Sequence, residues 1–226
     1  MLNSSEILYK KYKDARDAAW NTLILFNVDK LPVSVGVIFK KLGITVGKYS
    51  NKEMPIAIKR SDLAETALLQ RAFTVYSDNN PLVFYNEATP ISELRFSLAH
   101  ELGHLLLSHS PSHWNQNAPT RKSIEIDANR FAVRLLSPAC VLKEMNITDK
   151  NEIAKLCGLP LSEAGERAKR LKALAKRNLF LKSELEKQVL EQFYPILPYS
   201  SNNSDKSPES TLPSSLKSNG ETPDSP

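Results

Sequence analysis

The sequence contains the run His100-Glu101-Leu102-Gly103-His104, in which two histidines lie four residues apart with a glutamate between them. On an α-helix, residues four apart lie on the same face, so both imidazoles can reach one metal ion. This arrangement is typical of zinc hydrolases. The chain has four histidines, and all of them lie between residues 100 and 113. The run therefore predicts a metal site with His100 and His104 as ligands.

The residues around this run predict the helix that the spacing needs. Thr89 and Pro90 are typical of an N-cap and a first helical position. Leucines and Ile91 then recur every three or four residues until Pro111. This pattern places both histidines in the interior of an amphipathic helix.

A catalytic zinc site usually has three protein ligands, so a third ligand is expected elsewhere. On a continuing helix His109 would point about 140° away from His104, so it is expected to be a polar helix end or a group that supports a ligand. A second helix is predicted to start near Ser123, a candidate cap, and to stop at Pro138. This helix carries two carboxylates, and either could be the third ligand.

Periodicity distinguishes these two carboxylates. Glu125 shares a helix face with small and apolar residues. Asp127 shares its face with Arg130 and Arg134, which is typical of a solvated, ion-paired surface. Glu125 is therefore predicted to point into the core as the third ligand, where a metal ion would compensate its charge. Asn129, one turn further, is either a hydrogen-bond partner of a ligand or an ordinary packing amide.

Two segments resemble the ImmA/IrrE family of metallo-endopeptidases. They are residues 95–107, around the histidine pair, and residues 125–138, which begin with Glu125-Ile126-Asp127-Ala128-Asn129. The resemblance extends over residues 10–140. It implies a gluzincin-like zinc peptidase in which His100, His104 and Glu125 hold Zn²⁺. Members of this family are bacterial or phage cytoplasmic enzymes, and they often cleave a helix-turn-helix repressor that is encoded beside them.

The residue types then imply a mechanism. Zinc would lower the pKa of water to about 7, and Glu101 would accept the proton as general base and pass it to the leaving amine. The group that stabilises the oxyanion stays open, because Tyr76, Tyr85, Arg95 and His109 are all candidates.

Two other functions also stay open. The chain could be a non-proteolytic zinc regulator that binds a repressor or DNA, although a purely structural site has no need of a base such as Glu101. It could also be an interaction module without metal, in which the motif is accidental. The position of Glu125 on a predicted buried face argues against that last reading.

The expected fold class is α+β. Strand-forming residues are separated by Asn, Asp, Pro and Lys clusters between the first helix and the histidine run. The predicted strands are Ile44–Tyr49, Ile56–Lys59, Phe73–Tyr76 and Leu82–Tyr85. They would form a small twisted sheet packed on helices, followed by a helical C-terminal extension.

Composition predicts three segments: a zinc peptidase domain at residues 1–145, a basic extension at residues 146–198 and a disordered tail at residues 199–226. The tail is rich in Ser, Pro and Asn and has almost nothing to bury. Residues 151–164 resemble a helix-turn-helix, with a serine cap on the second helix.

The segment from Glu166 to Lys187 has eight lysines and arginines against three glutamates. Such a surface could make weak contact with DNA phosphates. The favoured alternative is an amphipathic helix that closes the peptidase domain, with Leu171, Leu174 and Leu181 in the core.

The formal net charge is +5, which suits an acidic partner but is also ordinary for solubility. Cys140 and Cys157 lack the spacing of a disulfide framework or zinc knuckle and are predicted to be core residues in a reducing cytoplasm. No signal peptide or membrane span is expected, because the longest apolar-rich run near the start, Trp20–Val28, is too short to cross a bilayer.

Overall fold

The computed structural model describes residues 4–50, 69–77, 80–109 and 118–198. These residues form eight α-helices, a three-stranded sheet and a short 3-10 helix, which confirms the predicted α+β class. In chain order the elements are α1 (Ser4–Leu25), α2 (Val35–Lys41), β1 (Thr45–Lys48), β2 (Ala72–Ser77), β3 (Asn80–Tyr85), α4 (Ile91–Leu106), α5 (Ala118–Leu136), α6 (Ala139–Glu144), α7 (Lys150–Cys157), α8 (Leu161–Lys176), α9 (Glu184–Gln192) and η3 (Tyr194–Ile196).

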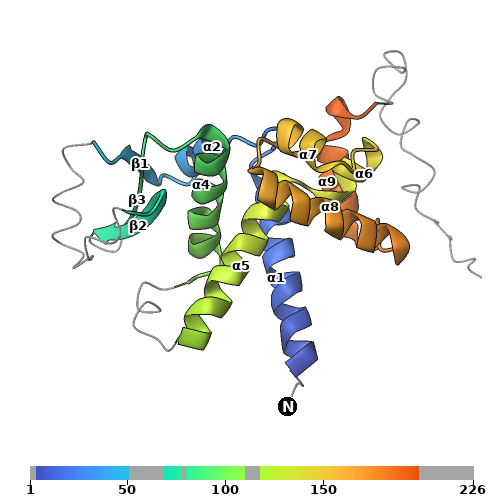
Figure 1. The fold of residues 1–226 in the computed structure, drawn as a ribbon, viewed down its shortest axis with the longest axis horizontal. Helices are drawn as coiled ribbons and strands as arrows, with labels where there is room; N and C mark the ends of the chain where they lie inside the picture. Colours follow the sequence, from blue (N-terminus) through green and yellow to red (C-terminus); the bar gives the residue numbers. More distant parts are fainter. Residues whose placement is uncertain (1–3, 51–68, 78–79, 110–117, 199–226) are drawn as a thin grey trace, which may run out of the picture.

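The sheet lies at one end of the molecule with α4 beside it, and helices α6 to α9 gather at the other end (Figure 1). Helices α1 and α5 occupy the middle. Helix α5 packs against both α4 and α1, and α4 also contacts β2 and β3. The histidine run on α4 therefore lies between the sheet and the rest of the helices.

The strand order in the sheet is β1-β3-β2, with β1 parallel and β2 antiparallel to β3. Side chains that are directly opposite on paired strands share a face of the sheet. Phe73 lies opposite Phe84, and both belong to a small separate cluster of buried residues. Thr74 lies opposite Val83, and Val83 belongs to the main core. Thr74 is therefore on the face that points toward the helices.

Three of the four predicted strands are confirmed with shifted ends. Residues 44–49, 73–76 and 82–85 correspond to β1, β2 and β3. The predicted strand at residues 56–59 lies outside the described residues.

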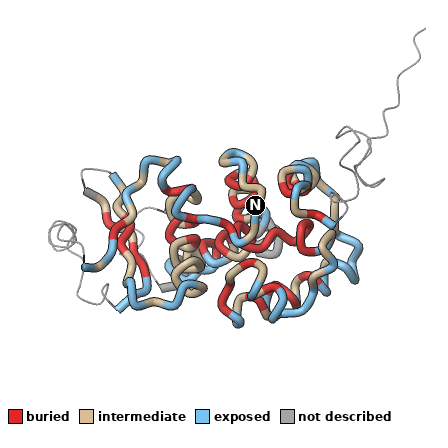
Figure 2. The backbone as a smooth tube through the Cα atoms, turned by 90° about the horizontal axis from the view of Figure 1, so that it is seen from above, coloured by how far each residue is buried: buried red, intermediate tan, exposed pale blue. Residues whose placement is uncertain are grey.

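A single large cluster of buried apolar residues connects all the described helices. It includes Trp20 of α1, Phe39 of α2, Leu102 of α4, Leu135 of α5 and Ile153 of α7. Figure 2 shows the buried residues along the inner sides of the helices and the sheet. Leucines of α4 and α5 therefore bring the two helices together on the face that their periodicity predicted.

The ends of α4 and α5 differ from the prediction by one or more residues. Helix α4 begins at Ile91 with Pro90 as its N-cap, and Ile91 itself is 69% exposed. It ends at Leu106, well before Pro111, because Ser108 adopts a left-handed conformation with φ of 56°. Helix α5 begins at Ala118, so Ser123 lies inside the helix and is not its cap.

The C-terminal helices share the main core with the rest of the described chain. Leu171 is buried, and Leu174 and Leu181 pack against the cluster, as the amphipathic-helix alternative expected. Arg167 was expected on the basic surface but is only 4% exposed. Its guanidinium donates to Ser137 Oγ and to the Val133 carbonyl at the end of α5, at 3.0 and 2.9 Å.

Helices α7 and α8 form a pair joined by a short turn. Asp149 caps α7 through the backbone N–H groups of Asn151 and Glu152. Gly158 ends α7 in a left-handed conformation with φ of 60°. Helix α8 follows at Leu161 with Pro160 as its N-cap, so the predicted serine cap is wrong.

The two cysteines lie in the core, as predicted from the absence of a disulfide or zinc-knuckle pattern. Cys140 and Cys157 are free and buried in the main core. Burial raises the pKa of the Cys157 thiol to about 12. Among the described residues, no helix is both long enough and apolar enough to cross a bilayer.

We expect Gly158→Ala to destabilise the protein by at least about 1–2 kcal/mol, because a left-handed conformation is costly for alanine. The added Cβ would also collide with the Arg95 guanidinium, which donates to the Gly158 carbonyl at 2.9 Å. Urea unfolding measures the effect.

The matched control is Gly165→Ala, since Gly165 lies within α8 with nothing within 4 Å of the added Cβ. This variant should be more stable than the parent by about 0.5–1 kcal/mol. Equal stability of the two variants would contradict the role given to Gly158.

Candidate metal centre

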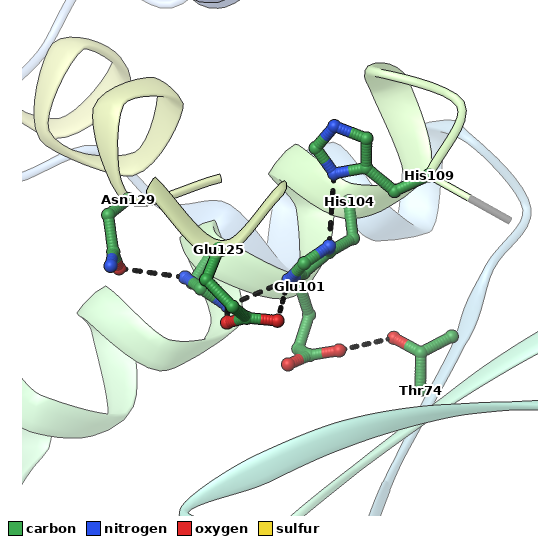
Figure 3. Close-up of polar contacts among 7 residues, drawn as sticks. Thr74, Glu101, His104, His109, Glu125 and Asn129 are labelled. Atoms are coloured by element: carbon green, nitrogen blue, oxygen red, sulfur yellow. Dashed lines mark hydrogen bonds and ion pairs between the residues drawn. The ribbon is translucent and has the colours of Figure 1, made fainter. Parts of the chain in front are cut away.

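Three predicted ligands converge between α4 and α5. The Nε2 atoms of His100 and His104 lie 2.8 Å apart. The Glu125 carboxylate lies 3.2 Å from His100 Nε2 and 3.6 Å from His104 Nε2. Figure 3 shows the carboxylate of α5 facing the two imidazoles of α4. One ligand atom from each residue lies within 4.8 Å of the other two, so this group could hold a metal ion.

The close approach of α4 to α5 depends on Gly103, in the middle of the histidine run. A Cβ at this position would lie 3.0 Å from Phe131 Cδ1 and 3.2 Å from the Ala128 carbonyl oxygen of α5. Both distances are tighter than ordinary van der Waals contact. The missing side chain therefore lets the two helices pack closely enough for Glu125 to reach the histidine pair.

Asn129 orients the first histidine. Its Oδ1 lies 2.9 Å from His100 Nδ1. Because a carbonyl oxygen can only accept, His100 Nδ1 donates this hydrogen bond. The other ring nitrogen, Nε2, is then left to bind a metal ion. The structure therefore supports the prediction that Asn129 is a hydrogen-bond partner of a candidate ligand, and not an ordinary packing amide.

His109 orients the second histidine, with its Nδ1 3.0 Å from His104 Nδ1. The turn after α4 explains this contact. The backbone N–H of His109 donates to the His104 carbonyl, and that of Ser108 donates to the Leu105 carbonyl. This is the Schellman pattern, which brings the second residue after the C-cap back over the last turn. His109 thus supports a predicted ligand, and His113 lies outside the described residues.

The carboxylates create a field that favours positive charge at this point. Hydrogen bonds from His100 and His104 hold the pKa of Glu125 well below its usual range, against the effect of burial. Burial opposes a charge on His100, but its hydrogen bond to Glu125 and the charges of Glu101 and Glu125 outweigh burial and raise its pKa. Such a field favours a metal cation for the same reason that it favours a proton.

Two details of α5 correct the sequence interpretation. The Glu125 side chain is 41% exposed, so it lies at the rim of the core and not within it. Asp127 and Arg134 were expected on a solvated surface, but they are only 8% and 7% exposed. Asp127 pairs with Arg130 at 3.0 Å, so the predicted ion pair forms, but its two side chains are only 12% and 24% exposed. Helix α5 packs against both α4 and α1, so less of its surface is solvated than the sequence pattern indicated.

Glu101, the predicted general base, is buried beside the cluster. It is 9% exposed and accepts a hydrogen bond of 2.7 Å from Thr74 Oγ1 on β2. Burial raises the pKa of Glu101, while the charge of His100 and the Thr74 hydrogen bond oppose this rise. A carboxylate with a raised pKa is better suited to accept a proton near neutral pH. The sequence analysis missed Thr74, although strand alternation around it was visible.

The four oxyanion candidates differ in position, and Tyr85 lies in β3, opposite Ala72 of β2. Arg95 donates to the Gly158 carbonyl, and His109 contacts His104. Burial and, to a smaller extent, the charge of Glu101 raise the pKa of Tyr76. They also raise the pKa of Tyr49, to about 12, but its hydroxyl donates to the Gln70 carbonyl.

We expect Gly103→Ala to lower the affinity for a divalent metal ion by roughly tenfold or more, because the added Cβ moves α4 away from α5 and misplaces Glu125. Stability alone is a poor readout, since alanine favours a helix by about 0.5–1 kcal/mol over glycine. A competition titration with a metal chelator measures the affinity. Gly165→Ala is the control, and equal affinity of both variants would refute this role of Gly103.

Comparison with known proteins agrees with this geometry. Residues 51–169, more than half of the chain, match the IrrE N-terminal-like domain of peptidase family M78. The matched range includes the histidine run, Glu125 and most of α8. No curated protein was found to match the chain. The chain therefore belongs to peptidase family M78, a family of metallopeptidases that carry the IrrE N-terminal-like domain.

Proposed function

We propose that this protein is a zinc-dependent endopeptidase that hydrolyses a peptide bond in a regulatory protein. The observation that carries the proposal is the convergence of His100, His104 and Glu125 beside the buried carboxylate of Glu101. Two imidazoles and one carboxylate are the ligand set of several catalytic zinc sites, which keep a further position for water. The family of the chain supports the same reaction class.

The donor set fits zinc on its chemistry. Each histidine turns Nε2 toward Glu125, and its Nδ1 contacts Asn129 or His109. Zinc-binding histidines usually have such a partner on the second ring nitrogen, which fixes the ring orientation. When bound, zinc supplies a Lewis acid that acidifies water and polarises a peptide carbonyl.

The proposed roles of the residues are metal binding and general base catalysis. His100, His104 and Glu125 hold the ion. Glu101 accepts the proton of the attacking water at its carboxylate and delivers this proton to the leaving amine as the peptide bond breaks. Glu101 is adjacent to His100 in the chain and lies on the side of α4 that faces β2, so it does not compete for the ligand position.

The proposed substrate is a helix-turn-helix transcriptional repressor in the same cytoplasm. This part of the proposal rests on the resemblance to the ImmA/IrrE family. The two buried free thiols are consistent with a reducing compartment. A weak contact with DNA through the exposed basic residues of the C-terminal helices is part of the same proposal.

The purified protein should bind one zinc ion per chain, measured by inductively coupled plasma mass spectrometry. His104→Ala and Glu125→Gln should each lower zinc affinity by about 100-fold or more, because three ligands become two. Asp127→Asn is the matched control, since Asp127 is the other carboxylate of the same stretch of α5 and pairs with Arg130. Glu125→Gln with parental affinity would remove Glu125 from the ligand set.

Incubation of the zinc-loaded protein with the repressor encoded beside it should produce a single cut, detected by intact-mass spectrometry. Glu101→Gln should lower the rate by about 100-fold or more, since general base catalysis contributes at least that factor. Its zinc content should equal that of the parent, because Glu101 is not a ligand. A stable complex with bound zinc and no cut would instead support the non-proteolytic regulator.

A further inference from the structure

The geometry points to Thr74 as a positioning residue: its hydroxyl holds the Glu101 carboxylate so that one oxygen stays available to the attacking water. This inference rests on the proposed peptidase function and deepens it. Thr74 does not touch the metal ligands in any described contact, and it would act only through Glu101.

The contact joins two elements that are far apart in the sequence. Thr74 Oγ1 donates to Glu101 Oε2 at 2.7 Å across 27 residues of sequence. Figure 3 shows the other carboxylate oxygen of Glu101 pointing away from Thr74. A charge-assisted bond of this length is strong for a hydroxyl donor. The bond thus occupies Oε2 and leaves Oε1 to accept a proton.

The sheet fixes the direction of this hydroxyl. Thr74 lies in the middle of β2, opposite Val83 of β3, and Val83 is fully buried in the main core. A β-branched side chain on a paired strand has few allowed rotamers. Glutamate, in contrast, has three rotatable side-chain bonds, so the carboxylate needs a fixed partner to keep one orientation. The fixed Thr74 hydroxyl on β2 therefore restricts the orientation of the flexible Glu101 side chain.

Burial makes this partner necessary. Glu101 is 9% exposed, and a buried carboxylate without hydrogen bonds is costly. Thr74 is the hydrogen-bond donor that the described contacts give to the Glu101 carboxylate. If the hydroxyl is removed, the carboxylate should turn to find another donor, and Oε1 then leaves the position from which it can take the proton.

The test compares Thr74→Val, which keeps the shape and removes the hydroxyl, with Thr74→Ser, which keeps the hydroxyl and removes the methyl group. Thr74→Val should lower kcat by about tenfold or more, with KM and zinc content unchanged, because misplacement of a reacting group by about 1 Å can cost 100-fold. Thr74→Ser should restore most of the rate. Thr45→Val, on the exposed start of β1, is the matched control and should behave as the parent.

Crystal structures of the two Thr74 variants give a readout that needs no activity. The Glu101 carboxylate should be displaced in Thr74→Val and unchanged in Thr74→Ser. An unchanged carboxylate in Thr74→Val, or a parental kcat, would overturn the inference. Equal loss of kcat in both variants would also overturn it, because packing of the methyl group would then be the cause.

The same structures separate failure of this inference from failure of the proposed function. A parent protein that binds zinc but cuts nothing would refute the peptidase. In that case displacement of Glu101 in Thr74→Val alone would still support the positioning role, and an unmoved carboxylate would still refute it.

Discussion

The close packing of α4 against α5 at Gly103 is the constraint on which the rest of this site depends. The two histidines need only a helix, but the carboxylate that completes the group comes from a different helix. A Cβ on residue 103 would already lie 3.0 Å from the Phe131 ring. Ala128 and the absent side chain of Gly103 together keep the interhelical space small. Gly103, between the two histidines, thus allows the close packing of α4 and α5, and this packing brings Glu125 to the histidines.

Each chemically important side chain is oriented by a partner from another part of the fold. Asn129 of α5 contacts His100, His109 of the turn after α4 contacts His104, and Thr74 of β2 contacts Glu101. None of these partners is part of the histidine run itself. The ring nitrogens and the carboxylate would otherwise rotate freely, and a ligand set that must be ordered on binding loses affinity. The sheet, the helix end and α5 therefore pre-organise the site from three directions.

The sequence was sufficient for the parts of the site that follow from helical periodicity. The spacing of His100 and His104, and the face of α5 that carries Glu125, need only a pitch of about 3.6 residues. Burial of Asp127 could not be predicted in this way, because it depends on how α5 packs against the other helices. The contact of His109 depends on a left-handed Ser108, a conformation that serine rarely adopts. Thr74 was missed because its partner lies 27 residues away, on an element whose distance from β2 is set by tertiary packing.

The C-terminal helices contact both helices that carry the candidate metal ligands. Arg95 of α4 donates to the carbonyl of Gly158, between α7 and α8. Arg167 of α8 donates to the Val133 carbonyl and to Ser137 at the end of α5. A buried guanidinium is costly unless its donors are used, so these bonds help to fix the position of α8. Part of the positive charge in this basic segment therefore serves to fix α8 against the end of α5, whereas other basic residues, such as Lys172 and Arg177, stay exposed on the surface.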